Sequence, residues 1–305
     1  MAAKWTEADI PSQKGRIIVI TGTGGLGFED ALALARAGAH VIIAGRNRDK
    51  GAQAVDAIRQ DAPDASVSFE LLDLADLASI AAFAGRLRAS HDSIDVLINN
   101  AGVMTPPKRR ETRDGFELQF GTNYLGHFAL TAHLLPLLRK GRAPRVVTLS
   151  SIAARQGQID FDDLQARWNY KPIPVYAQSK LACLMFAFEL ARQSDAHGWG
   201  VASIAAHPGV ARTDLLTNGA GEWSLFGLAR KFLWFLFQPA AQGALPTLFA
   251  ATSPQAANGD YYGPDKISEI RGFPAPATPP AKALDVTAAA KLWQVSEMLT
   301  GVIFE

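Results

Sequence analysis

The chain has 305 residues, of which 48% are hydrophobic and 19% charged, and its formal net charge is +1. This composition supplies enough apolar material for a large core and excludes a disordered chain, and the balanced charge gives no reason to expect a nucleic-acid partner. The single cysteine, Cys183, excludes an intrachain disulfide framework. Because the sequence has no HxxEH pattern and no Cys/His cluster, no metal site is expected.

The amino terminus lacks the apolar core of a secretory signal, so a cytoplasmic protein is expected. The nearest approach to a membrane segment is 225–237, LFGLARKFLWFLF, which is too short to span a bilayer and is interrupted by Arg230 and Lys231. No membrane contact is therefore expected. The aromatic residues and two cations of this segment leave open the alternative of an interfacial anchor.

Short β-rich apolar runs alternate with alanine- and leucine-rich stretches along the chain. Strands are expected at 16–20, 40–45, 67–72, 96–99, 145–149 and 201–206, and helices at 31–37, 52–59 and near 287–300. The proline-rich stretch 272–280 is expected to be an extended surface segment. Apolar strands separated by helices indicate a parallel sheet covered on both faces. The fold class is therefore α/β, with one doubly wound parallel sheet in a single domain over residues 1–305.

A glycine-rich turn, TGTGGLGFE, follows the first expected strand at residues 21–29. A turn of this kind lets the backbone approach a pyrophosphate, whose charge the next helix stabilises with its N-terminus. Glycines also serve ordinary turns, but the position of this cluster directly after an apolar strand favours nucleotide binding. The residues expected to contact the cofactor here are Gly22, Thr23, Gly25, Leu26 and Gly27.

For a nicotinamide dinucleotide, the end of the second expected strand would distinguish NAD(H) from NADP(H). Enzymes that prefer NAD commonly place an acidic residue there, whereas this chain has Arg46 and no carboxylate. A guanidinium group suits a 2′-phosphate in both charge and geometry. We therefore expect NADP(H) rather than NAD(H), with a solvated loop residue as the alternative reading of Arg46.

Tyr176 and Lys180 lie four residues apart in VYAQSK and would share one face of a helix. An ammonium group beside a phenol stabilises its anion, which suits a proton donor and acceptor in carbonyl or alcohol chemistry. Such a pair also occurs by chance on surface helices, so it carries weight only together with other motifs.

Those other motifs are present in a fixed order. They are TGxxGLGFE, Asp73 in LLDLADL, NNAG at 99–102, NYLGHF at 123–128, LSS at 149–151, YxxxK at 176–180 and HPG at 207–209. In this order the sequence resembles the short-chain dehydrogenases/reductases over essentially its whole length, and especially the retinol-dehydrogenase-like branch and its bacterial relatives. The resemblance implies a Rossmann-type sheet with strand order 3-2-1-4-5-6-7.

The resemblance also implies a role for each motif residue. Tyr176 would be the general acid/base, Lys180 its partner and a ligand of the nicotinamide ribose, and Ser151 the donor beside the carbonyl oxygen, with Ser150 as the competing choice. Asn123 would support a water that contacts Lys180, although an asparagine there could also be a cap. The remaining cofactor contacts would come from Asp73, Leu74, Asn100, Ala101, Gly102, Pro208, Gly209, Val210 and Thr213, of which Thr213 could instead cap a helix.

One motif departs from the family pattern. The family loop usually has three residues between its first two glycines, whereas only two separate Gly22 from Gly25. The turn is thus one residue short, and we expect shifted contacts to the phosphate and ribose of the cofactor.

Two further segments are expected to shape the substrate site. Between Ser151 and Tyr176 lie 24 residues that include Phe161, Trp168 and Tyr170, and residues 210–240 form an apolar stretch expected to act as a lid over a core at 14–200. These aromatics could equally fill the core.

The leading interpretation is an NADP(H)-dependent oxidoreductase that interconverts hydrophobic ketones or aldehydes and alcohols. A catalytically silent NADP-binding regulator and a lid-anchored peripheral membrane dehydrogenase for retinoids or lipids are the alternatives. The sequence leaves open whether the protein is a monomer or a homo-oligomer.

Overall fold

A computed structural model describes residues 4–211 and 238–305 of the chain. Its centre is an eight-stranded sheet in the order β3-β2-β1-β4-β5-β6-β7-β8, in which every neighbouring pair is parallel except β7 and β8. The strands are β1 (Ile17–Thr21), β2 (His40–Gly45), β3 (Ser66–Leu71), β4 (Val96–Asn99), β5 (Arg145–Leu149), β6 (Ala202–Ala206), β7 (Tyr261–Lys266) and β8 (Arg271–Pro276).

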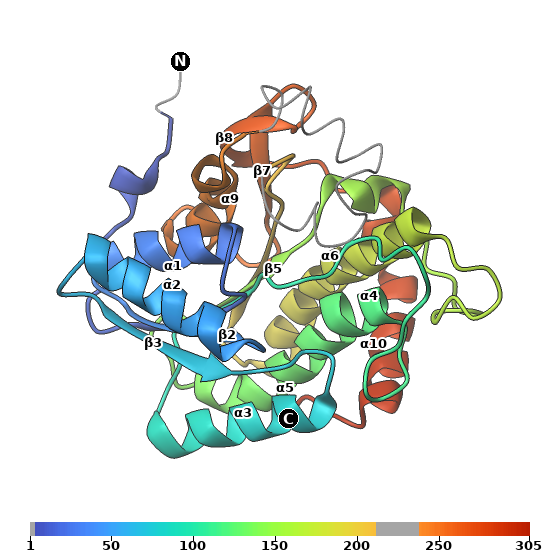
Figure 1. The fold of residues 1–305 in the computed structure, drawn as a ribbon. Helices are drawn as coiled ribbons and strands as arrows, with labels where there is room; N and C mark the ends of the chain where they lie inside the picture. Colours follow the sequence, from blue (N-terminus) through green and yellow to red (C-terminus); the bar gives the residue numbers. More distant parts are fainter. Residues whose placement is uncertain (1–3, 212–237) are drawn as a thin grey trace.

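Helices cover both faces of the sheet (Figure 1). This is expected because its central strands are mainly apolar along their length, and such strands are buried on both faces. One face packs against α1 (Leu26–Arg36), α2 (Arg48–Asp61) and α9 (Ala240–Thr252), and the other against α3 (Leu77–Ser90), α5 (Gly126–Leu138) and α6 (Pro172–His197). Shorter elements are η1 (Glu7–Asp9), α4 (Leu118–Phe120), η2 (Gly121–Leu125), η3 (Ile152–Gln156) and η5 (Ala281–Leu284).

The last helix, α10 (Val286–Thr300), lies against α6 rather than against the sheet (Figure 1). Its Trp293 meets Phe128 of α5 and Phe186 of α6, with ring centroids 5.1 and 5.9 Å apart. The helix expected near 287–300 is therefore confirmed, and it closes the apolar surface of the two helices beneath it. Within residues 4–211 and 238–305, none of the helices combines the length and apolar character needed to cross a membrane.

The doubly wound α/β fold and its strand order are confirmed, and the six expected strands coincide with β1 to β6 within a residue at each end. The expectation for 272–280 is wrong in part, because β8 there pairs antiparallel with β7. The prolines Pro274 and Pro276 are tolerated because β8 is the edge strand and need not donate on its outer side.

The order of strands determines where a ligand can bind. β1 pairs with β2 on one side and β4 on the other, so the chain reverses its direction of winding between β1 and β4. In open parallel sheets, ligands bind in the crevice outside the carboxyl ends of the strands at this point. The glycine turn, the NNAG segment and the LSS segment all follow strands that end at this edge.

Candidate active site

The glycine turn connects β1 to α1 and leaves the helix N-terminus open. Gly25 precedes the helix with a positive φ of 54°, and no side chain caps the first turn. A methyl group on Gly27 would lie 2.5 Å from Asn100 Nδ2 and 2.8 Å from the Gly22 carbonyl oxygen, so only glycine fits there. Uncapped backbone N–H groups at the start of a helix form an anion site, and the turn therefore fits a pyrophosphate.

The neighbouring turns supply further polar groups at the same edge. Arg46 follows β2, is exposed, and makes no ion pair within the part of the chain that the structure describes. Asp73 follows β3 and is half-buried, and its Oδ1 accepts a hydrogen bond of 3.0 Å from the Ala75 amide. Leu74 beside it is buried. Arg46 is thus free to meet a ligand, while Asp73 also stabilises the turn after β3 through its bond to Ala75.

Asn123 lies in η2, a turn of π-helix between α4 and α5, and is fully buried. Wide turns of this kind are rare and are frequent at functional sites. The side-chain amide accepts from the Val103 amide at 2.7 Å and donates to the Val103 carbonyl at 3.0 Å and to Ser179 Oγ at 3.0 Å. Asn123 therefore fixes the chain just after the NNAG segment, which a helix cap would not do.

Tyr176 and Lys180 lie on α6 and are 8% and 5% exposed. The ammonium group of Lys180 donates to the Leu149 carbonyl at 3.0 Å, at the end of β5. Ser150 Oγ donates to the Lys180 carbonyl at 2.8 Å, whereas Ser151 Oγ accepts from the Ala153 amide at 3.2 Å. The hydroxyl hydrogen of Ser150 is therefore engaged inside the protein, while that of Ser151 remains available to a ligand.

These residues meet in one cavity of about 240 Å³. The cavity is lined by Leu26, Asn100, Met104, Thr105, Leu149, Ser150, Ser151, Ile152, Ala153, Ile173, Tyr176, Lys180, Pro208, Gly209, Val210 and Ala211. Asn123 lies behind the wall, and a methyl group on Gly102 would be 3.0 Å from Asn123 Oδ1 and 3.8 Å from Lys180 Nζ. Thr213 and most of the expected lid lie outside the described residues.

The long segment before Tyr176 contributes to this cavity in a different way from the one expected. Its Ile173 lines the cavity, whereas Trp168 is 79% exposed and Phe161 packs against the core beside Lys291. Tyr170 donates a hydrogen bond to the Pro106 carbonyl at 2.7 Å. Among the described residues, these three aromatics therefore anchor the segment or face solvent.

A charged cluster that no sequence motif indicated lies next to the cavity. Glu269, in the turn between β7 and β8, contacts His207 Nε2 at 2.9 Å and Arg155 at 2.7 Å. Burial opposes ionisation of Glu269, but the hydrogen bonds from His207 and the Thr278 amide, with the charge of Arg155, lower the pKa of its carboxyl group to about 2. Glu269 thereby ties η3, which follows Ser151, to the HPG segment, and both contribute residues to the cavity wall.

The turn that carries Glu269 is conformationally unusual. Ile267, Ser268 and Glu269 all have positive φ, between 51° and 66°, which is rare for residues with side chains. No signal in the sequence indicated this turn, because the turn depends on the pairing of β7 with β8, which local periodicity does not reveal.

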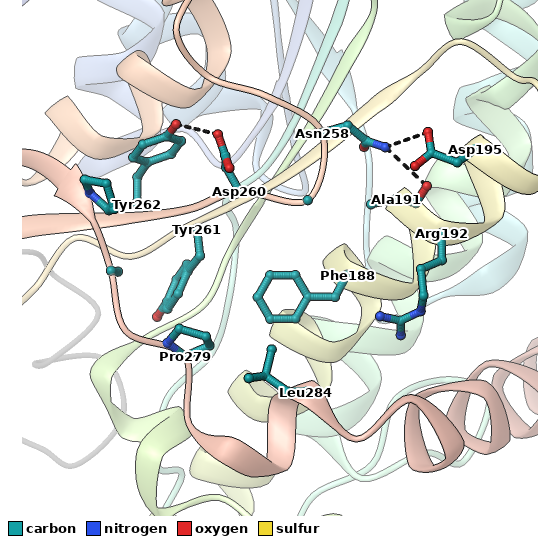
Figure 2. Close-up of a pocket in the computed structure, with 13 residues that line it drawn as sticks. Phe188, Ala191, Arg192, Asp195, Asn258, Asp260, Tyr261, Tyr262, Pro279 and Leu284 are labelled. Atoms are coloured by element: carbon teal, nitrogen blue, oxygen red, sulfur yellow. Dashed lines mark hydrogen bonds between the residues drawn. The ribbon is translucent and has the colours of Figure 1, made fainter.

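A larger cavity, of about 480 Å³, lies between α6 and the β7–β8 region (Figure 2). Its polar side chains are largely paired with one another or with the backbone: Tyr262 donates to Asp260 at 2.6 Å, and Asn258 donates to Asp195 at 3.0 Å (Figure 2). The smaller cavity, in contrast, presents a phenol, a free hydroxyl and an ammonium group to one space. It is therefore the candidate active site.

Comparison with known proteins agrees with this geometry. The profile of the short chain dehydrogenase family matches residues 16–222. Polyprenol dehydrogenase from Mus musculus is 40% identical over 299 residues, covering 96% of this chain and 86% of that protein. Retinol dehydrogenase 12 from Mus musculus is 40% identical over 303 residues, with coverage of 98% and 90%.

Solved structures give the same result. An uncharacterized protein from Mycobacterium paratuberculosis is 40% identical, with a TM-score of 0.83 and coverage of 99% of this chain and 100% of that one. A short chain dehydrogenase from Shigella flexneri, crystallised with NADP, has a TM-score of 0.65 at 24% identity, with coverage of 83% and 98%, and shares the fold. The chain therefore belongs to the short-chain dehydrogenase/reductase family, in its retinol-dehydrogenase-like branch.

Proposed function

We propose that this protein is an NADP(H)-dependent oxidoreductase that interconverts hydrophobic alcohols with the corresponding ketones or aldehydes. One observation carries the proposal: Tyr176, Lys180 and the free hydroxyl of Ser151 line one cavity whose other walls are mainly apolar. Such a cavity offers a proton donor and a polar anchor to a substrate that is otherwise apolar.

The nicotinamide cofactor, when bound, supplies or accepts the hydride. In reduction, Tyr176 gives its phenolic proton to the carbonyl oxygen as negative charge develops there, and in oxidation the phenolate takes the proton back. Lys180 stabilises the phenolate by its charge, and Ser151 donates a hydrogen bond to the same substrate oxygen. Asn123 holds the segment opposite Lys180 in place through its bonds to Val103.

NADP(H) is supported by the donor groups at the edge of the sheet. The cradle of Gly22 and Gly27 and the uncapped start of α1 suit a pyrophosphate. Arg46, which has no ion-pair partner among residues 4–211 and 238–305, suits a 2′-phosphate. Pro208, Gly209 and Val210 would contact the nicotinamide end, because they line the cavity opposite Tyr176.

A long apolar alcohol is the substrate class we favour. The cavity wall takes Met104, Ile152, Ile173 and Val210 from four different segments, and these apolar side chains can bury an apolar ligand. The relatives named as polyprenol and retinol dehydrogenases act on alcohols of this type, judging by their names.

The test is Tyr176→Phe, which keeps the ring but removes the proton donor. Turnover of retinol-like and other hydrophobic alcohols with NADP, and of ketones with NADPH, should fall by about 10²–10⁴. NADPH binding, measured by fluorescence titration, should change little. Tyr262→Phe is the matched control, since it removes a hydroxyl that bonds Asp260 away from the cavity.

More than about a tenth of wild-type activity in Tyr176→Phe would show that another group transfers the proton. Tight NADPH binding by a wild-type protein that turns over no alcohol or ketone would instead favour the silent regulator.

A further inference from the structure

His127 is a buried histidine of α5 for which the proposed mechanism has no role. It is 2% exposed and lies one helical turn after Asn123, in the NYLGHF segment. Its Nδ1 lies 2.9 Å from the Asn123 carbonyl oxygen, and its Nε2 lies 2.9 Å from Thr21 Oγ1. Both ring nitrogens are therefore engaged, each with a different part of the site.

The chemistry of the two partners determines where the proton lies. A carbonyl oxygen can only accept, so Nδ1 carries the hydrogen and donates to Asn123. Burial lowers the pKa of His127 to about 4, and the charge of Lys180 acts in the same direction against the hydrogen bond to Asn123. The ring is thus neutral at physiological pH, and Nε2 has a lone pair that accepts the hydroxyl hydrogen of Thr21.

Thr21 contacts both segments proposed to bind the cofactor, the glycine turn and the NNAG segment. It is the last residue of β1, directly before the glycine turn, and its Oγ1 accepts from the amides of Asn100 and Ala101 at 2.9 and 3.0 Å. Its own hydrogen faces two acceptors, the Ile98 carbonyl at 3.3 Å and His127 Nε2 at 2.9 Å. We assign it to His127, because Nε2 is the nearer acceptor and has no hydrogen of its own to donate. The glycine turn and the NNAG segment are thereby joined to the imidazole.

The second partner of His127, the Asn123 carbonyl group, belongs to the part of the site near Lys180. The Asn123 carbonyl oxygen accepts from His127 and also from Cys183 Sγ at 3.1 Å, both of them side chains. These bonds hold η2 in its wide turn, and η2 in turn presents the Asn123 amide to Val103 and to Ser179, next to Lys180.

We propose that His127 is a positioning residue that couples the cofactor turn to the turn carrying Asn123, through two separable hydrogen bonds. The Nε2 bond to Thr21 sets the cofactor segments, and the Nδ1 bond to Asn123 sets the catalytic wall. This inference rests on the proposed oxidoreductase function for its kinetic consequences, but its binding and protonation consequences do not depend on it.

Two substitutions of His127 each keep one of its two hydrogen bonds and remove the other. The side-chain amide of asparagine reaches about as far as Nδ1 of histidine, and that of glutamine reaches about as far as Nε2. His127→Asn can still donate to Asn123 but loses Thr21, so NADPH affinity should fall about 5–10-fold with kcat nearly unchanged. His127→Gln can accept from Thr21 but loses Asn123, so kcat should fall by a similar factor with NADPH affinity nearly unchanged.

Thr21→Val supplies a cross-check. Combined with His127→Asn it should weaken NADPH binding no more than Thr21→Val alone, because both changes remove the same bond. Thr131→Val is the matched control. On the same helix as His127, Thr131 Oγ1 donates to the His127 carbonyl and accepts from Asn99 at the end of β4, so its loss should lower stability without separating affinity from kcat.

Protonation can be observed directly. In ¹⁵N-histidine NMR spectra of the full chain, His127 should be protonated at Nδ1 alone and should not titrate between pH 8 and about pH 5. A proton on Nε2 would overturn the proposal. So would a result in which both variants lose NADPH affinity and kcat together, in proportion to the fall in their melting temperatures. A wild type that is inactive on every substrate would defeat the proposed function, while NADPH affinity and NMR would still decide the role of His127.

Discussion

Asp30, a buried residue of α1, allows a direct test of how burial shifts the pKa of a carboxyl group in this protein. It lies on α1, one turn after Gly27, and is completely buried. Neither carboxylate oxygen has a hydrogen-bond partner within the part of the chain that the structure describes. Burial, with a smaller contribution from the neighbouring Glu29, raises the pKa of Asp30 well above its ordinary value of 3.8.

The raised pKa fixes the sign of the pH dependence. The unfolded chain loses this proton above its ordinary pKa, whereas the folded protein keeps it to higher pH, so folding takes up a proton. Stability therefore falls as pH rises from about 4 toward the folded pKa, by at most ~1.4 kcal/mol per pH unit, and then levels off. Asp30→Asn has nearly the same shape and no titration, so it removes this slope.

We expect Asp30→Asn to be more stable than wild type at pH 7 and about equally stable near pH 4, with the difference growing by at most ~1.4 kcal/mol per pH unit between the two. For a chain of this size each kcal/mol of gain corresponds to roughly 2 °C in melting temperature. The assay is thermal and urea unfolding of both proteins between pH 4 and pH 8. Asp56→Asn, on the exposed side of α2, is the control and should leave the pH profile unchanged.

A stability difference that is the same at every pH would refute this reasoning. It would mean that Asp30 has the same pKa in the folded and unfolded states, so that burial does not govern its titration.

Three further changes test the site. Arg46→Ala should weaken NADPH binding about 10–100-fold and NADH binding little, because only NADPH carries the 2′-phosphate; equal losses in parallel titrations would assign Arg46 to loop support. A small residue inserted after Gly24 should lower the KM for NADPH with little change in kcat; an altered ketone preference at constant KM would contradict this. Glu269→Gln should reduce kcat several-fold while the affinity for NADPH is unchanged, with Asp265→Asn in the same hairpin as the control. An unchanged kcat in Glu269→Gln would show that Glu269 does not position the cavity walls.

Local patterns predicted the parts of the fold that depend on nearby residues. The six strands β1 to β6 were found because each is a short apolar run between helices, and the Tyr176–Lys180 pair was found because helical spacing places residues four apart on one face. Residues from several of the motifs line one cavity, since the strands that precede them end at one edge of the sheet.

The parts that escaped prediction depend on contacts between distant residues. β8 contains prolines that argue against a strand, and it exists because it is an edge that pairs with β7. Glu269 is in place only when that hairpin turns back onto His207, 62 residues earlier. The wide turn at Asn123 similarly depends on His127 and Cys183, and the latter is 60 residues away along the chain.

The short glycine turn shows how such distant contacts limit the effect of a local change. The inner side of the turn is fixed from outside, because the Gly22 amide donates to the Ala44 carbonyl at 2.8 Å and Asn100 donates to the Thr21 carbonyl at 2.7 Å. On the outer side, a methyl group on Gly24 would meet nothing within 4 Å. A missing residue is therefore absorbed where the turn faces open space, while the close approach of Gly22 to Gly27 is kept by its neighbours. We therefore expect the proposed pyrophosphate cradle to survive the deletion, and any altered contact to the cofactor to lie at Thr23 and Gly24.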